Sequence, residues 1–179
     1  MIPGVYGAVT VRLVEAAGFA AAYLTGAGVS LFATAVPVLG VTSLGDVCAR
    51  LERVTAATSL PIVGDADIGY GGVLSVIRTV REFERRGAAA IQLEDQVFPK
   101  RCGHEPGRPC VALAEMVGRL HAALDSRSTQ DLLIVARTDA LGATRDVLDD
   151  LAGHGEVWEL FERGGWLALE ARYLSPGAD

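Results

Sequence analysis

Reactive side chains gather in one short stretch that directly follows an apolar run. Residues 89–93 are typical of a buried strand, and Glu94-Asp95 marks the point where the chain turns polar. Beyond Pro99 comes the run Lys100-Arg101-Cys102-Gly103-His104. Two cations, a thiol and an imidazole within five positions are more than a simple connection needs. We therefore interpret this run as an active-site lid.

Acidic side chains follow a second apolar run. Residues 61–64 predict a buried strand that leads into Asp65 and Asp67, and an i, i+2 spacing places both carboxylates on one face of a strand. Such a pair repels itself unless a cation or a shared proton is present. Together with Glu94 it suits a hard cation with oxygen ligands, such as Mg²⁺. Two structural alternatives stay open: the aspartates could cap the next helix or turn, and Glu94 could pair with Arg137.

Two further strand ends carry groups that could bind an anion. The strand predicted over residues 20–24 leads into Thr25-Gly26-Ala27-Gly28, where small residues let backbone N–H groups approach a ligand closely. The strand predicted over residues 132–136 leads into Arg137. Both positions suit the carboxylate of a small acid.

The elements that must position these groups alternate along the chain. Apolar spacing predicts helices over residues 8–17, 43–57, 73–86 and 112–124, and residues 30–40 are predicted to form a loop. Strands alternating with helices indicate a parallel sheet with helices outside it. In such folds the chemistry lies at the carboxyl ends of the strands, where all the groups named above are found.

Composition narrows the class of protein. The 179 residues have a net charge of −6, are 50% hydrophobic and 21% charged, and contain no apolar run of membrane-spanning length. A nucleic-acid surface is not expected, and the N-terminus lacks signal-peptide features, so we expect a cytoplasmic protein without a membrane partner. The three cysteines are expected to be thiols; zinc on Cys102, Cys110 and His104 is a weak alternative. The glycine-rich run 69–72 lacks the spacing of a nucleotide-binding loop.

Four segments in order, residues 23–28, 65–71, 94–104 and 136–139, resemble the motifs of the isocitrate lyase/phosphoenolpyruvate mutase superfamily. The Lys-Arg-Cys-Gly-His run is similar to that of its carbon–carbon lyase branch, which includes methylisocitrate lyase and dimethylmalate lyase. Carboxyvinyl-carboxyphosphonate phosphorylmutase-like members are also similar.

This resemblance implies an α/β fold, a (β/α)8 TIM-type barrel with C-terminal helices. Only five βα units are recognisable, over residues 1–141, so about three strands are missing through an internal deletion or an omitted segment. Residues 142–179 resemble the family's C-terminal helices, which make subunit contacts in a homotetramer.

The resemblance also implies a Mg²⁺-dependent lyase, with Mn²⁺ possible, that cleaves a small 2-hydroxy di- or tricarboxylic acid through an enolate or aci-carboxylate. The implied catalytic residues are Cys102, Arg137, Tyr23, Lys100 and His104. The implied substrate-binding residues are Thr25, Gly26, Ala27, Arg137, Gly103 and His104. The implied metal ligands are Asp65, Asp67 and Glu94.

Two departures from the family pattern keep other functions open. Val38 stands where the family usually has an aspartate near the metal's water shell, and Gly7 stands where an aspartate usually follows Tyr6. Within enzymes, the alternatives are an oxaloacetate decarboxylase or hydrolase and a phosphonopyruvate-type carbon–phosphorus enzyme. From another class, the alternative is a catalytically degenerate protein that binds acids or assembles.

Overall fold

The computed structural model describes residues 1–102 and 108–139. Its strands are β1 (Gly4–Val5), β2 (Ala22–Leu24), β3 (Ile62–Asp65), β4 (Ala90–Glu94) and β5 (Leu133–Arg137). Its helices are α1 (Ala8–Ala16), α2 (Gly26–Thr34), α3 (Leu44–Thr55), α4 (Val73–Arg85) and α5 (Leu113–Ser126). The predicted alternation of strands and helices is therefore confirmed over these residues.

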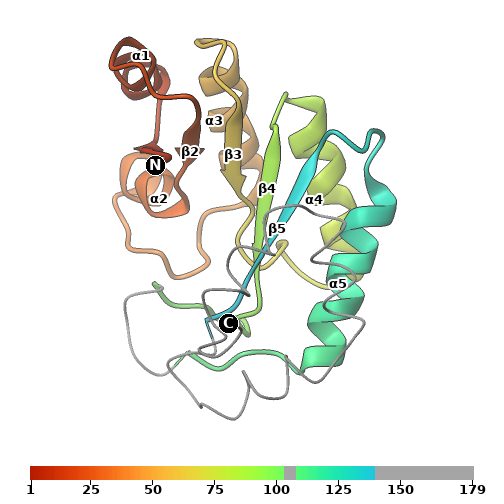
Figure 1. Ribbon diagram of the computed structural model, residues 1–179. Coiled ribbons are helices and arrows are strands. Elements are labelled where there is room, and N and C mark those ends of the chain that lie inside the picture. Colours follow the sequence, from red (N-terminus) through yellow and green to blue (C-terminus); the bar gives the residue numbers. More distant parts are fainter. Residues whose placement is uncertain (103–107, 140–179) are drawn as a thin grey trace, which may run out of the picture.

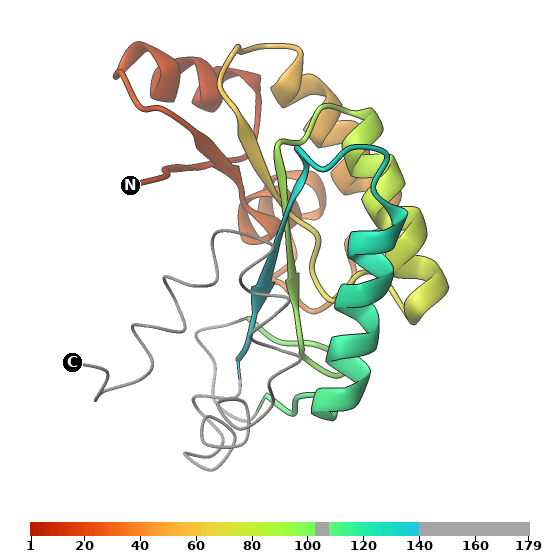
Figure 2. The same cartoon turned by 45° about the vertical axis from the view of Figure 1, so that its right-hand side comes forward.

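The five strands form one parallel sheet in the order β1-β2-β3-β4-β5. Parallel crossovers are right-handed, and because the strand order never reverses they all place their helices on one face. Figures 1 and 2 show α3, α4 and α5 side by side along that face. In a (β/α) barrel the helices likewise all lie on one face of the sheet. In a doubly wound sheet the strand order reverses, and helices cover both faces. Closure of the barrel by further strands stays a prediction.

The helix starts and ends confirm most of the local predictions. Ser43 caps α3 by accepting a hydrogen bond from Asp46 N (3.2 Å), and the Asp46 side chain returns one to Ser43 N (2.9 Å). Gly18 and Gly87, just beyond α1 and α4, have φ of 80°, the left-handed conformation that ends helices.

Two local predictions are wrong. The loop predicted over residues 30–40 is helix in its first part, since α2 starts at Gly26 and runs to Thr34, and residues 35–40 are loop as predicted. Thr25 caps it by accepting a hydrogen bond from Gly28 N (2.7 Å), which outweighs the low helix propensity of the two glycines. In α1 the apolar residues Val9 and Leu13, whose spacing predicts the helix, do not form its buried face: they are exposed (74% and 65%), and Val11 packs into the core instead.

The core lies between the sheet and its helices. Strand residues that point toward the helices are fully buried, among them Leu24, Ile62 and Ile91, and Phe83 of α4 belongs to the same core. Alternate strand residues that point to the opposite face, including Tyr23, Val63 and Gln92, are only partly buried. One face of the sheet therefore stabilises the fold, and the other presents side chains toward the centre of the arc.

Close packing at Gly64 of β3 gives a stability prediction. A Cβ on Gly64 would lie 2.7 Å from Phe83 Cε1 in the core, so we expect Gly64→Ala to lower the free energy of unfolding by about 1–3 kcal/mol. The matched control is Gly118→Ala within α5, where no atom lies within 4 Å of the new Cβ. That change should stabilise the helix by about 0.5–1 kcal/mol. Urea unfolding of both variants measures the difference, and equal effects would contradict the packing.

Several predictions fall outside the described residues. Gly103 and His104 of the proposed lid do so, as does the whole C-terminal helical segment 142–179 with its subunit contact. Within residues 1–102 and 108–139, no helix is long and apolar enough to cross a membrane.

Candidate active site

The predicted site residues of the described chain lie at one edge of the sheet. Asp65, Glu94 and Arg137 are the last residues of β3, β4 and β5, and Thr25 follows β2 directly. Because the strands are parallel and adjacent, their carboxyl ends form a single rim (Figure 1). The prediction that the candidates meet at the carboxyl ends is confirmed, and we call this edge the rim.

The glycine-rich turn after β2 holds Asp65. Gly26 N donates a hydrogen bond to Asp65 Oδ2 (3.0 Å), and Asp67 N donates one to Oδ1 (3.1 Å). A Cβ at Gly26 would lie 2.8 Å from Asp65 Oδ2, so only glycine permits this approach without a shift. The Gly26 N–H, predicted to face the substrate, is therefore already bound to a carboxylate, while the prediction for Ala27 stays untested.

Asp67 lies at the rim because of a backbone turn that its i, i+2 spacing from Asp65 did not predict. It lies beyond β3 with a φ of 57°, so the i, i+2 rule for one strand face does not apply to it. Its Oδ1 accepts a hydrogen bond from Ile68 N (2.7 Å), which fixes this left-handed turn. The turn leaves Oδ2 free to meet Lys100 Nζ at 3.0 Å.

Glu94 lies between two cations and is only 3% exposed. Its Oε1 is 2.6 Å from Lys100 Nζ, and its Oε2 is 3.3 Å from Arg137 Nη1. Burial raises the pKa of Glu94 to about 7, with the Lys100 ammonium acting in the opposite direction. The structural alternative, a Glu94–Arg137 pair, is therefore present, and Glu94 and Arg137 face each other in the register of β4 and β5.

A second layer of polar residues supports the rim, and the sequence analysis gave these residues no role. Asp139 accepts hydrogen bonds from Arg137 Nε and Nη2 (3.0 and 2.9 Å), which orient the guanidinium. Gln96 also donates to Asp139 and is 1% exposed. Asp95 accepts hydrogen bonds from Thr138 Oγ1 (2.6 Å) and from Asp139 N (2.9 Å). One feature of the sequence could have pointed to these four residues. Asp95 and Gln96 lie in segment 94–104, and Thr138 and Asp139 lie in segment 136–139, both of which carry the family resemblance.

Tyr23 lies on the partly buried face of the sheet, below the rim. Gln92 Nε2 donates a hydrogen bond to its hydroxyl oxygen (2.9 Å). Burial, and then the negative charge of Asp65, raise the pKa of Tyr23 well above its usual value. Tyr23 therefore stays neutral at physiological pH, where it can donate a hydrogen bond but cannot serve as a phenolate base.

The segments on either side of the predicted lid are bonded to each other beside the rim. Gln96 pairs with Cys110 in an antiparallel bridge, and Val97 N donates to Pro109 O (2.8 Å). Gln96 Oε1 also accepts a hydrogen bond from Arg101 N (3.0 Å), and its Nε2 donates to Arg101 O (3.2 Å). Through these two hydrogen bonds, Gln96 fixes the backbone of Arg101, the neighbour of Cys102, relative to Glu94.

The cysteines are free thiols, as predicted. Burial, with the Asp95 carboxylate beside it, raises the pKa of Cys110 to about 12, so this thiol stays protonated and is a poor zinc ligand. Cys102 is half-buried, two residues beyond Lys100. Cys102 follows Arg101, whose backbone Gln96 holds.

The described residues contain no three His, Cys, Asp or Glu side chains that converge on one point as a ready metal cage. Asp65, Asp67 and Glu94 supply only oxygen atoms, and together with Asp139 they outnumber the cations Lys100 and Arg137. A hard divalent cation that keeps several of its waters fits this donor set, because it needs few direct protein contacts.

A small cavity beside the two aspartates contains the departure at Val38. It is lined by Val38, Gly26, Ser30, Gly40, Thr42, Val47, Asp65, Asp67 and Tyr70. Thr42 Oγ1 is buried and has no hydrogen-bond partner among the described residues. The apolar Val38 therefore leaves a polar corner of this cavity incompletely satisfied.

We expect Val38→Asp to strengthen Mg²⁺ binding about tenfold, because a third carboxylate would then line the cavity of Asp65 and Asp67. Isothermal titration with Mg²⁺ measures the change. Val38→Asn has a similar size without the charge and should leave the affinity within about twofold of the original. Equal Mg²⁺ affinities of Val38→Asp and Val38→Asn would contradict an effect of the added charge.

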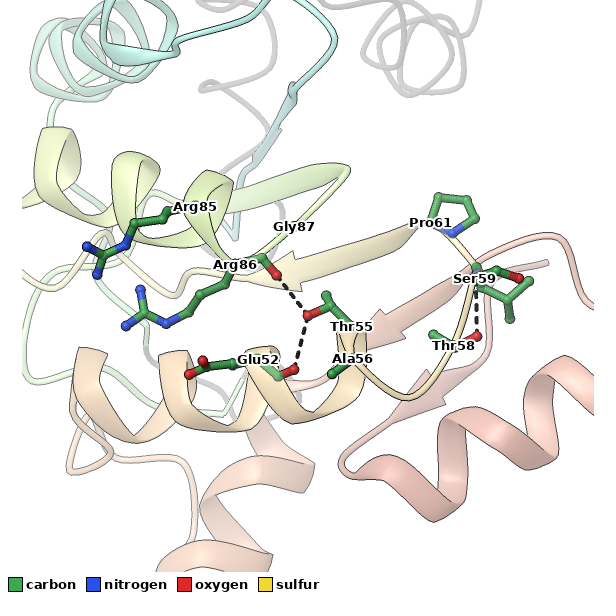
Figure 3. A pocket seen from close by; sticks show the side chains of 10 residues that line it. Glu52, Thr55, Ala56, Thr58, Ser59, Pro61, Arg85, Arg86 and Gly87 are labelled. Atoms are coloured by element: carbon green, nitrogen blue, oxygen red, sulfur yellow. Dashed lines mark hydrogen bonds between the residues drawn. The ribbon is translucent and has the colours of Figure 1, made fainter.

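A second hollow lies at the opposite end of the sheet, where β3 begins (Figure 3). Arg85 and Arg86 line it, but both form ion pairs with Glu82. Thr55 Oγ1 donates to the Arg86 carbonyl (2.8 Å), which ties α3 to the end of α4. The groups here serve the packing of the helices, and none of the predicted site residues lies here.

Comparison with known proteins agrees with this geometry. The profile of the phosphoenolpyruvate phosphomutase family matches residues 1–164. A 2-methylisocitrate lyase of Shewanella oneidensis is 46% identical over 140 residues, which is 78% of this chain and 48% of that protein. A crystal structure of 2,3-dimethylmalate lyase is 36% identical with a TM-score of 0.81, covering 89% of this chain and 54% of that one. Oxaloacetate acetylhydrolase bound to 3,3-difluorooxalacetate is 29% identical with a TM-score of 0.83, covering 98% and 63%.

The chain spans about half the length of the curated relatives that it matches. Within residues 1–102 and 108–139 the sheet has five strands, where a full barrel has eight. The family profile, the relatives named as lyases and the acidic rim of a singly wound parallel sheet lead to one conclusion: the chain belongs to the phosphoenolpyruvate mutase/isocitrate lyase superfamily.

Proposed function

We propose that this protein contributes the active site of a Mg²⁺-dependent carbon–carbon lyase for a small 2-hydroxy di- or tricarboxylic acid of the methylisocitrate type. The observation that carries the proposal is the fastening of the Cys102 segment to the acidic rim through Gln96 and Lys100. Two cations and carboxylates of the rim thereby meet at one strand edge, and Cys102 follows Lys100 by two residues. The names of the relatives support the same reaction class.

Asp65, Asp67 and Glu94 would hold the metal, with Mn²⁺ as a possible substitute for Mg²⁺. When bound, the divalent cation would polarise the hydroxyl and a carboxylate of the substrate. The protein's own part is to keep the three carboxylates in place through the bonds to Gly26 N, Asp67 N, Ile68 N and Arg137.

The proposed reaction breaks the carbon–carbon bond next to the carbinol carbon. The hydroxyl loses its proton to a base, the carbinol becomes a carbonyl, and the bonding electrons leave as an enolate or aci-carboxylate. Arg137, held by Asp139, would stabilise the negative charge, and Cys102 would give its proton to the carbanionic carbon. Tyr23 keeps its predicted catalytic part, with a raised pKa that keeps its hydroxyl protonated.

Cationic groups would select an acidic substrate despite the net charge of −6. Arg137 is partly exposed at the rim (33% of its side chain), so its guanidinium can meet a carboxylate. His104 and Gly103 keep their predicted part in gripping a second carboxylate, and Thr25 and Ala27 keep theirs at the end of β2.

A second candidate, hydrolysis of an oxaloacetate-like acid, is favoured by the similarity to oxaloacetate acetylhydrolase over 98% of the chain. Incubation with a panel of 2-hydroxy acids and oxaloacetate, with Mg²⁺ or EDTA, separates the reactions. Mg²⁺-dependent release of pyruvate or glyoxylate from a 2-hydroxy acid supports the lyase, and oxalate released from oxaloacetate supports the hydrolase. Acid binding without any product would support the degenerate binding protein.

A further inference from the structure

Lys100 places an ammonium group inside the acidic rim. Its Nζ lies 2.6 Å from Glu94 Oε1 and 3.0 Å from Asp67 Oδ2, and its side chain is 5% exposed. A buried ammonium is costly unless carboxylates pair with it, and here two do so. The same two oxygens belong to residues proposed to hold the metal.

An ammonium and a divalent cation cannot both use these oxygens favourably. Mg²⁺ binds oxygen at about 2.0–2.1 Å or through its own water shell, and in either mode it would meet the same Asp67 and Glu94 oxygens that the Lys100 ammonium now faces. Two cations sharing carboxylates in a partly desolvated site also repel each other strongly. Metal loading therefore requires the Lys100 ammonium to leave Asp67 and Glu94.

We propose that Lys100 is a built-in competitor of the divalent cation, which neutralises Asp67 and Glu94 until the metal displaces it. The inference rests on the proposed function in one point, the assignment of the metal to this rim. It gives Lys100 a role in the metal-free protein that differs from its predicted contact with the substrate. Since Lys100 precedes Cys102 by two residues, the same exchange frees a cation next to the proton donor for the incoming acid.

The backbone of this segment does not depend on Lys100. Gln96 holds both the N–H and the carbonyl of Arg101, so the Lys100 side chain can withdraw by rotation about its own bonds. Replacement of Lys100 should therefore leave the segment in place, which makes the competition testable by substitution.

The experiment measures Mn²⁺ binding to the protein without substrate, by the electron paramagnetic resonance signal of free Mn²⁺. Lys100→Met keeps the length of the apolar stem and removes the charge, and we expect it to bind Mn²⁺ about tenfold more tightly than the original protein. The matched control is Arg101→Met, which removes a neighbouring exposed cation that has no ion pair with Asp67 or Glu94. It should change the affinity by less than about twofold.

Each outcome decides a separate point. Unchanged or weaker binding by Lys100→Met, or equal tightening by Arg101→Met, overturns the competition and leaves the metal site standing. Absence of Mn²⁺ binding in all three proteins overturns the metal assignment of the proposed function and the competition with it. Lys100→Gln provides a second neutral variant, and circular dichroism confirms that each protein tested is folded.

Discussion

Replacing Cys102 with serine is expected to lower kcat by about 10²- to 10⁴-fold while leaving the affinity for Mn²⁺ unchanged. A serine hydroxyl is a much weaker acid than a thiol, so it cannot supply the proton that the carbanionic carbon needs. Cys102 is not among the oxygen-bearing residues proposed to hold the metal, so metal binding should not follow the loss of turnover. Steady-state kinetics on the 2-hydroxy acid accepted in the panel, with Mn²⁺ titration alongside, measures both quantities.

The matched control is Cys110→Ser. Cys110 is bound into the antiparallel bridge with Gln96, and its raised pKa keeps the thiol protonated. Its replacement should alter kcat by less than about threefold. Normal turnover in Cys102→Ser would remove Cys102 from the mechanism, and an equal loss in Cys110→Ser would indicate damage to the lid as a whole.

The second large effect is expected at Asp65. Asp65→Asn keeps the size of the side chain but loses its charge, and the amide can accept only one of the two hydrogen bonds now given by Gly26 N and Asp67 N. We expect Mn²⁺ affinity to fall at least about 100-fold, because loss of even an indirect ligand costs 10- to 100-fold. Turnover at low metal concentration should fall with it.

Asp95→Asn serves as the contrasting variant. Asp95 is also buried at the rim, but it accepts hydrogen bonds from Thr138 and from Asp139 N, whereas the ion pairs of Lys100 and Arg137 go to Asp67, Glu94 and Asp139. Its replacement should lower the free energy of unfolding by about 2 kcal/mol and leave Mn²⁺ affinity within about threefold. If Asp95→Asn weakened metal binding as much as Asp65→Asn, the division between a ligand and a supporting carboxylate would be wrong.

The superfamily, the parallel strands and most helix boundaries could be predicted from the sequence because they depend on local signals. The alternation of apolar runs predicts β3, β4 and β5, and the capping residue Ser43 and the terminal glycines 18 and 87 predict where helices begin and end. The carboxyl-end rule then places Asp65, Glu94 and Arg137 on one rim, because each follows an apolar run directly.

The start of α2 and the buried face of α1 were not predictable in the same way. In α2 a single side-chain bond from Thr25 outweighs the poor propensity of Gly26 and Gly28, and propensity alone favours a loop. In α1 two helix faces carry apolar residues, and only the position of the sheet decides that Val11 packs inward while Val9 and Leu13 stay exposed.

The sequence by itself therefore determined which chemical groups this protein brings to its rim: three carboxylates, an arginine and a lysine-arginine-cysteine run. Only the tertiary structure decided how they are paired. The left-handed turn at Asp67, the two hydrogen bonds of Gln96 to Arg101 and the approach of Lys100 to Glu94 join residues that belong to different turns and loops. Such pairings depend on distances set by the sheet register and by burial, which sequence spacing does not specify, because a buried charge takes whichever partner the fold places within reach.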